Sequence, residues 1–144
     1  MKKQFKTGDK VSVSKAFSKE EVLAYLKIST DTNPIHYDEE FASSTTFKKC
    51  IVPGMLVSSL FGGMLGSELP GNGTILLSQS SDFRKPVFVG EEVTAEIEII
   101  KIREDKPIIT FKTICKKNND DIAIDGEAVV KFESYISVTQ KNRV

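Results

Sequence analysis

Histidine and cysteine are scarce in this sequence. It has one histidine, His36, and two cysteines, Cys50 and Cys115, which lie far apart and outside any Cys-x-x-Cys motif. Zinc sites built from cysteine and histidine need several such ligands at short spacings, so the sequence offers no convincing metal site. Both cysteines have aliphatic neighbours, and we expect them to be small buried residues in a reducing compartment.

An excess of charge of either sign is also missing, because 20 Lys and Arg residues balance 20 Asp and Glu residues. Without a basic excess or a dense Lys/Arg run, nucleic acid is not an expected partner.

No apolar run reaches the roughly 20 residues of a membrane helix; the nearest, Ile51 to Leu69, contains four glycines and a proline. Met1 to Lys10 is charged and does not resemble a signal peptide. We therefore expect a soluble cytoplasmic protein.

The first half of the chain carries helical signals. Ser18-Lys19-Glu20-Glu21 is a capping box, and the apolar spacing after it predicts a helix to about Ile28. Thr30 to Tyr37 is predicted to be a loop, and Asp38 is a suitable cap for a short helix through Ala42. Met55 to Leu65 is apolar on most sides, which predicts a buried helix.

The second half is strand-like, with alternating apolar residues between tight turns. Long strands joined by tight turns favour an antiparallel sheet. We predict a single α+β domain over residues 1–144, in which a curved sheet wraps one long central helix, with a frayed tail over about 134–144. The expected strands are Val11 to Ser14, Thr74 to Phe83, Val87 to Val89, Glu92 to Ile102, Ile108 to Lys116 and Ile122 to Phe132.

Asp31, Asn33 and His36 are the strongest candidates for chemistry, because they fall within six residues of a loop stiffened by Pro34. A carboxylate and an imidazole on one bend can face a single pocket and divide the roles of base and acid. The same residues are also good turn and cap formers, so Asp31 could instead only satisfy backbone amides. The residues alone leave these two interpretations evenly balanced.

Gly54 is the second candidate, because it follows Pro53 at the start of the apolar helix. Free N–H groups and the positive end of the helix dipole meet there, and such a position can hold a developing oxyanion. The alternative is that Pro53-Gly54 only turns the chain into the helix. None of the serines lies in a Gly-x-Ser-x-Gly motif, so a serine triad is not expected.

These segments resemble the MaoC-like, (R)-specific enoyl-CoA hydratases. The resemblance rests on Ser29 to Asp38 with Phe41-Ala42, on Ile51 to Leu56, on Phe83 to Val93 and on Gly126 to Val130. It implies the hot-dog fold, a homodimer or higher oligomer, and reversible addition of water to a trans-2-enoyl-CoA to give an (R)-3-hydroxyacyl-CoA. It implies no cofactor, since CoA is part of the substrate.

The resemblance also implies roles for individual residues. Asp31 would take a proton from the attacking water, His36 would bind that water and help to protonate C2, and the Gly54 amide would bind the thioester carbonyl. Asn33 would brace the loop. Gly62, Leu65 and Val130 are candidates for lining the acyl pocket. Members of the family can carry a serine where this chain has Gly62, and its hydroxyl would support the aspartate; a water molecule or Ser59 is the candidate replacement.

Two other functions stay open at this point. A hot-dog thioesterase would use Asp31 to activate water against the thioester carbonyl. A non-catalytic subunit would bind acyl-CoA without turning it over. Arg84 and Lys85 are candidates for contacting CoA phosphates, but a position at an exposed strand end explains them better.

Overall fold

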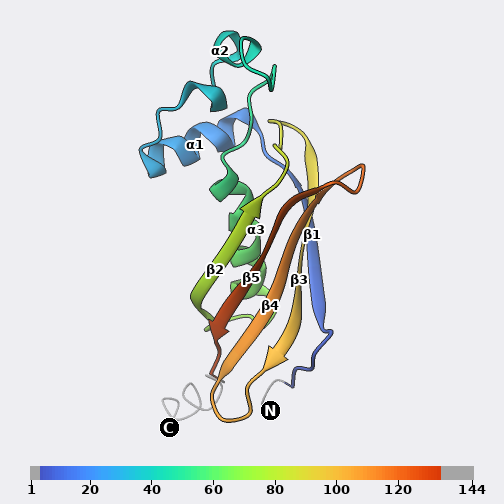
Figure 1. Cartoon of the computed structure of the whole chain (residues 1–144). Helices are drawn as coiled ribbons and strands as arrows, with labels where there is room; N and C mark the ends of the chain where they lie inside the picture. The colour runs from blue at the N-terminus through green and yellow to red at the C-terminus, as the bar shows by residue number, and fades with distance from the viewer. Residues whose placement is uncertain (1–3, 134–144) are drawn as a thin grey trace.

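A five-stranded antiparallel sheet with one helix lying across its face forms the body of the molecule (Figure 1). The computed structural model describes residues 4–133, so the predicted frayed tail, 134–144, lies outside the described residues. The sheet order is β1-β3-β4-β5-β2. The elements are β1 Lys10–Ala16, α1 Lys19–Ser29, the 3₁₀ helix η1 Pro34–His36, α2 Glu39–Ser43, α3 Gly54–Ser67, β2 Ile75–Phe83, β3 Glu92–Ile102, β4 Ile108–Lys117 and β5 Ile122–Lys131.

The strand pattern read from the sequence is largely confirmed. β3 has the predicted bounds, and its alternate residues Val93, Ala95, Ile97 and Ile99 are buried against the core while those between them are more exposed. One face of an antiparallel sheet packing on a core produces this alternation. The fold prediction, a sheet wrapped around a central helix, is therefore correct.

The predicted strand Val87 to Val89 is wrong. Only Phe88 forms a β-bridge, to Ile51, and it stands outside the five strands. Pro86 lacks an N–H on one side, and Gly90 turns the chain with a φ of +85° on the other. These two residues leave no room for a continuous ladder.

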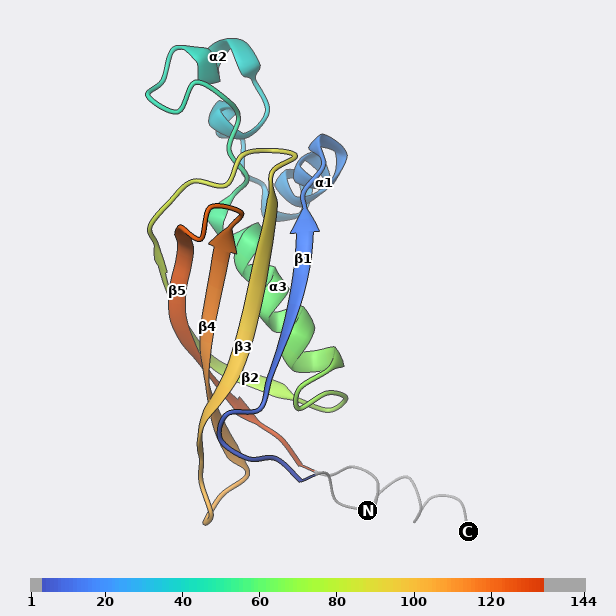
Figure 2. The same ribbon diagram turned by 90° about the vertical axis from the view of Figure 1, so that its right-hand side faces the viewer.

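Helix α3 packs on the sheet with one side only. Val57, Phe61, Met64 and Leu65 are buried, whereas Met55 on the opposite side is 62% exposed. The prediction of a buried helix is thus confirmed for the side that faces the sheet, because a single sheet covers only one side of a helix. Figure 2 shows α3 running along that face of the sheet.

Helices α1 and α2 gather at one end of the sheet (Figure 1). The predicted capping box opens α1: the Glu21 N–H donates to Ser18 Oγ at 3.1 Å, and the Ser18 N–H donates to Glu21 Oε1 at 3.0 Å. Thr30 ends the helix in a left-handed conformation with a φ of 60°. No helix within residues 4–133 is long and apolar enough to cross a membrane.

Candidate active site

Asp31 is the first residue after the cap of α1, and its backbone N–H donates to the Leu26 carbonyl at 3.2 Å. Its Oδ1 accepts a hydrogen bond from the Asn33 N–H at 2.8 Å. This is an Asx-turn, in which a short side chain imitates a backbone turn. The second carboxylate oxygen, Oδ2, is left to face His36.

His36 ends the 3₁₀ helix, whose first turn is capped by Asn33 Oδ1 accepting from the Ile35 N–H at 3.2 Å. The imidazole Nδ1 lies 2.8 Å from the Ile51 carbonyl oxygen. Since a carbonyl only accepts, Nδ1 must carry the proton of this hydrogen bond. In the neutral ring Nε2 is then unprotonated, and Nε2 is the atom that faces Asp31.

The two candidate groups lie close together. His36 Nε2 is 3.6 Å from Asp31 Oδ2, with side chains 10% and 35% exposed respectively. This distance is too long for a direct hydrogen bond. The capping and the catalytic interpretations of Asp31 are therefore compatible, because one oxygen holds the loop while the other is directed at the imidazole.

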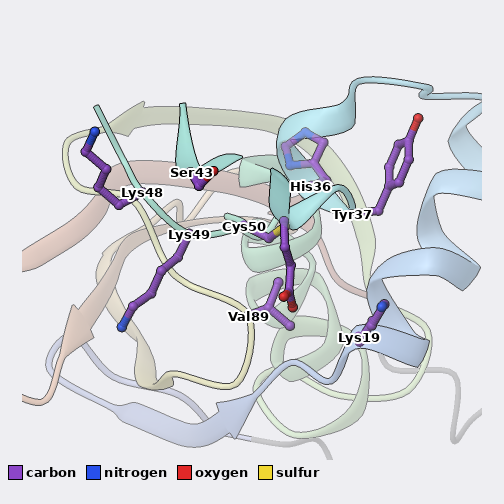
Figure 3. Close-up of a pocket in the computed structure, with 9 residues that line it drawn as sticks. Lys19, His36, Tyr37, Ser43, Lys48, Lys49, Cys50 and Val89 are labelled. Carbon is purple, nitrogen blue, oxygen red and sulfur yellow. The ribbon is translucent and has the colours of Figure 1, made fainter. Parts of the chain in front are cut away.

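The two side chains also line different hollows of the single chain, and whether they face one substrate pocket stays a prediction. His36 lines a cavity of about 440 Å³ together with Tyr37 and Cys50 (Figure 3), whereas Asp31 lines a shallower depression with Thr30 and Tyr37. Residue spacing along a loop indicates which side chains are neighbours, but it does not determine how the surrounding surface encloses them. Tyr37 borders both spaces.

Gly54 begins α3, and within residues 4–133 nothing accepts a hydrogen bond from its N–H. It lines a third cavity, of about 470 Å³, with Ile51 and Phe83. A Cβ on Gly54 would lie 2.7 Å from the Phe83 ring, which is too close. Glycine at this position therefore allows the ring to pack against the start of α3. Ile51 connects the His36 site with the Gly54 cavity. Its carbonyl oxygen accepts the hydrogen bond from His36, and Ile51 also lines the cavity beside Gly54.

The serines of α3 differ in their hydrogen bonding. Ser59 Oγ donates to the Leu56 carbonyl at 2.5 Å on the exposed side, so its hydrogen is already committed. Ser58 is 8% exposed, and its Oγ has no partner among the described residues. It lies one helical turn before Gly62. The i, i+4 spacing makes Ser58 and Gly62 neighbours on the surface of α3.

The remaining predicted substrate contacts fall into different environments. Asn33 braces the loop through the hydrogen bonds described above. Gly62 is exposed, and a Cβ there would meet nothing within 4 Å. Leu65 and Val130 are 2% and 0% exposed and belong to the hydrophobic core. Their position gives them a packing role, and their assignment to an acyl pocket stays a prediction.

The structure also shows the surroundings of Arg84 and of the two cysteines. Arg84 Nη2 forms an ion pair with Asp125 Oδ2 at 2.8 Å, and the Lys112 ammonium group beside Oδ1 holds the pKa of Asp125 below its usual range. Cys115 is buried as expected, but Cys50 is only partly buried. Burial nevertheless raises the pKa of the Cys50 thiol, which keeps it protonated and weakly nucleophilic at neutral pH. Within residues 4–133, no three His, Cys, Asp or Glu side chains are grouped as metal ligands.

The family model for the MaoC like domain matches residues 1–119. This chain belongs to the MaoC-like domain family. A MaoC-like protein named (R)-specific enoyl-CoA hydratase, from Aeromonas caviae, is 51% identical over 125 residues, which are 87% of this chain and 93% of that protein. A tomato protein (Solanum lycopersicum) named mitochondrial 3-hydroxyacyl-[acyl-carrier-protein] dehydratase is 38% identical over 133 residues, which are 91% of this chain and 79% of that protein.

A solved structure supports the MaoC-like assignment. The structure titled "(R)-hydratase from A. caviae involved in PHA biosynthesis" matches with a TM-score of 0.89 and 48% identity, covering 92% of this chain and all of that one. The predicted hot-dog architecture is thereby confirmed.

Proposed function

We propose that this MaoC-like chain is an (R)-specific enoyl-CoA hydratase, which adds water reversibly to a trans-2-enoyl-CoA to give an (R)-3-hydroxyacyl-CoA. The observation that carries this proposal is the approach of Asp31 Oδ2 to His36 Nε2 at 3.6 Å, on a loop that three hydrogen bonds hold in place. The names of the relatives, hydratases and dehydratases acting on acyl thioesters, support the same reaction class.

The chemistry needs a base, a proton donor and a stabiliser for the enolate that forms beside the thioester. In this proposal a water molecule binds between Asp31 Oδ2 and His36 Nε2. Asp31 takes a proton from this water as the water oxygen attacks C3. The Asp31–His36 pair then passes that proton to C2. The Gly54 N–H, at the positive end of α3, holds the thioester oxygen as it gains charge.

The edge of the sheet supports a further part of the proposal, namely that the chain forms a homodimer. β2 is an edge strand, and its residues Ile75, Leu76 and Leu77 are 52%, 49% and 53% exposed. Edge strands with exposed apolar side chains pair readily with another strand. Since the isolated chain divides the candidate residues among separate cavities, a second subunit is expected to complete the enclosure of the substrate.

We also place the enzyme in the cytoplasm in this proposal. Its two cysteines are both free, which is usual in a reducing compartment.

The test is incubation of the purified protein with crotonyl-CoA, following the absorbance of the enoyl double bond and the release of free thiol in parallel. The proposal expects loss of the enoyl absorbance with no thiol release. Thiol release without hydration would identify a thioesterase instead. Binding of crotonyl-CoA without any reaction, by a folded protein, would identify a non-catalytic subunit.

A further inference from the structure

Lys117 is the last residue of β4 and occupies a position where the alternation of the strand places apolar side chains. Ile109, Phe111 and Cys115, on the same face of β4, are buried. Lys117 continues this face, and it pairs with Val93 of β3, which is 0% exposed. Its own side chain is 12% exposed. A largely buried ammonium group is costly unless partners surround it, so the contacts of Lys117 indicate what it does.

These contacts all fall in residues 86–91, the pre-β3 segment, which leads into β3. Lys117 Nζ donates to the Pro86 carbonyl at 2.7 Å and lies 3.2 Å from Glu91 Oε1. It also lies 5.0 Å from the centre of the Phe88 ring, a cation–π contact. The same Glu91 oxygen accepts a hydrogen bond from the Phe88 N–H at 3.1 Å. One lysine therefore holds both ends of the pre-β3 segment and the ring between them.

The pre-β3 segment is joined to the chain that follows the candidate catalytic loop. Phe88 forms a β-bridge with Ile51. Two backbone hydrogen bonds flank this bridge: the Val52 N–H donates to the Val87 carbonyl at 2.7 Å, and the Val89 N–H donates to the Cys50 carbonyl at 3.2 Å. Cys50 and Val89 lie together in the wall of the cavity that His36 lines (Figure 3). The position of Ile51 thus depends on the position of the pre-β3 segment.

Ile51 in turn holds the imidazole. Its carbonyl oxygen accepts the hydrogen bond from His36 Nδ1 at 2.8 Å, and its N–H donates to the Ile35 carbonyl at 3.2 Å. These two hydrogen bonds determine where His36 Nε2 lies relative to Asp31 Oδ2, 3.6 Å away. A continuous series of contacts therefore runs from Lys117, through the pre-β3 segment and Ile51, to His36.

We propose that Lys117 is a positioning residue of the hydratase, which fixes the pre-β3 segment and thereby holds His36 in the place and the tautomer that the reaction needs. Lys117 does not touch the reacting atoms, and its effect passes through the backbone of Ile51. The expected effect on turnover rests on the proposed function. The expected effect on the imidazole does not, because it can be measured without substrate.

The first test is Lys117→Met, which removes the ammonium group and keeps an unbranched side chain. A small displacement of a catalytic group lowers the rate strongly, so kcat for hydration of crotonyl-CoA should fall by roughly 10- to 100-fold while KM changes by less than about 2-fold. The matched control is Lys112→Met on the same strand. Lys112 is also ion-paired, to Asp125 Oδ1, but it lies on the other face of β4, and its loss should change kcat by less than about 2-fold.

The second measurement uses the fact that His36 is the only histidine of the chain, so that a ¹⁵N NMR spectrum shows one imidazole. In the neutral ring of the wild type, the proton is expected on Nδ1, because the Ile51 carbonyl can only accept. Lys117→Met should increase the fraction of rings with the proton on Nε2, and Lys112→Met should not. A residue that only stabilises the fold would leave this ratio unchanged in the folded protein.

Glu91→Gln tests the same contacts independently, and it replaces Lys117→Met if that variant does not fold. The new amide oxygen can still accept from the Phe88 N–H, but Lys117 loses its charged partner. The tautomer ratio and kcat should change in the same direction as in Lys117→Met, and by less. Since the two residues share one contact, the double variant should have a kcat no lower than that of Lys117→Met alone.

The inference is overturned if folded Lys117→Met retains the wild-type kcat and tautomer ratio, or if kcat falls while the ratio stays unchanged. Equal effects of Lys112→Met overturn it as well. If Lys117→Met does not fold, a wild-type kcat and tautomer ratio in Glu91→Gln overturn it. Failure of the proposed function looks different, because the wild type would then not hydrate crotonyl-CoA, while the tautomer ratio would still respond to Lys117→Met.

Discussion

The substitution Asp31→Asn separates the two roles that the structure assigns to Asp31. Asparagine has the same shape, and its Oδ1 can still accept the hydrogen bond that Asp31 Oδ1 accepts from the Asn33 N–H at 2.8 Å. The atom facing His36 changes from a carboxylate oxygen to a neutral amide group. The loop should therefore be retained, while the base is lost.

The expected size of the effect follows from these contacts. Loss of a general base typically costs about 10²- to 10⁴-fold in rate. Stability should change by at most about 1 kcal/mol, because an ion pair with a partly exposed partner contributes little. Asp31→Ala should lower the rate similarly and also destabilise the protein by about 1 kcal/mol, since it removes the acceptor of the Asn33 N–H.

The assay is hydration of crotonyl-CoA, with urea unfolding of the wild type and both variants in parallel. The expected pattern is two inactive variants, of which only Asp31→Ala is clearly less stable. If Asp31→Asn retains near-wild-type kcat, Asp31 is not the base. If both variants are equally destabilised, Oδ1 has no structural role separate from that of Oδ2.

Three other perturbations test neighbouring parts of the structure. His36→Gln should lower kcat for hydration on the order of 100-fold with the fold retained, and unchanged turnover would remove His36 from the mechanism. Gly126→Ala should destabilise the protein by about 3 kcal/mol or more in urea unfolding, because the new Cβ would clash with the Ser80 carbonyl oxygen of β2. The control is Gly62→Ala, whose Cβ meets open space. Equal stabilities of the two variants would contradict this. A hydrogen bond from Lys15 lowers the pKa of Glu21 from 4.5 to about 2. The stabilisation by the Glu21 carboxylate should therefore be present at neutral pH and be lost as the pH falls from about 4.5 towards 2. A difference in stability between wild type and Glu21→Gln that persists at about pH 2 would disprove this.

The local features of the site could be predicted from the sequence. The Ser18 capping box, the Asp38 cap and the bounds of β3 follow from short-range hydrogen bonding and from alternating burial, which neighbouring residues determine. The proximity of Asp31 and His36 was predictable for the same reason, because a turn stiffened by Pro34 leaves few ways to arrange six residues.

The features that depend on tertiary structure could not be predicted. The tautomer of His36 is determined by the Ile51 carbonyl, which is 15 positions away. Leu65 and Val130 face the core because the sheet curves around α3. The contact of Lys117 with Pro86 and Glu91 requires the pairing of β4 with β3, and no spacing in the sequence indicates it.

The most direct test of the central claim is dehydration of pure (R)- and (S)-3-hydroxybutyryl-CoA by the wild-type protein, followed as the appearance of crotonyl-CoA. Reversible hydration at one fixed Asp31–His36 pair predicts that only the (R) isomer is dehydrated, and that Asp31→Asn abolishes this activity. Equal dehydration of both isomers, or of neither, would contradict the account.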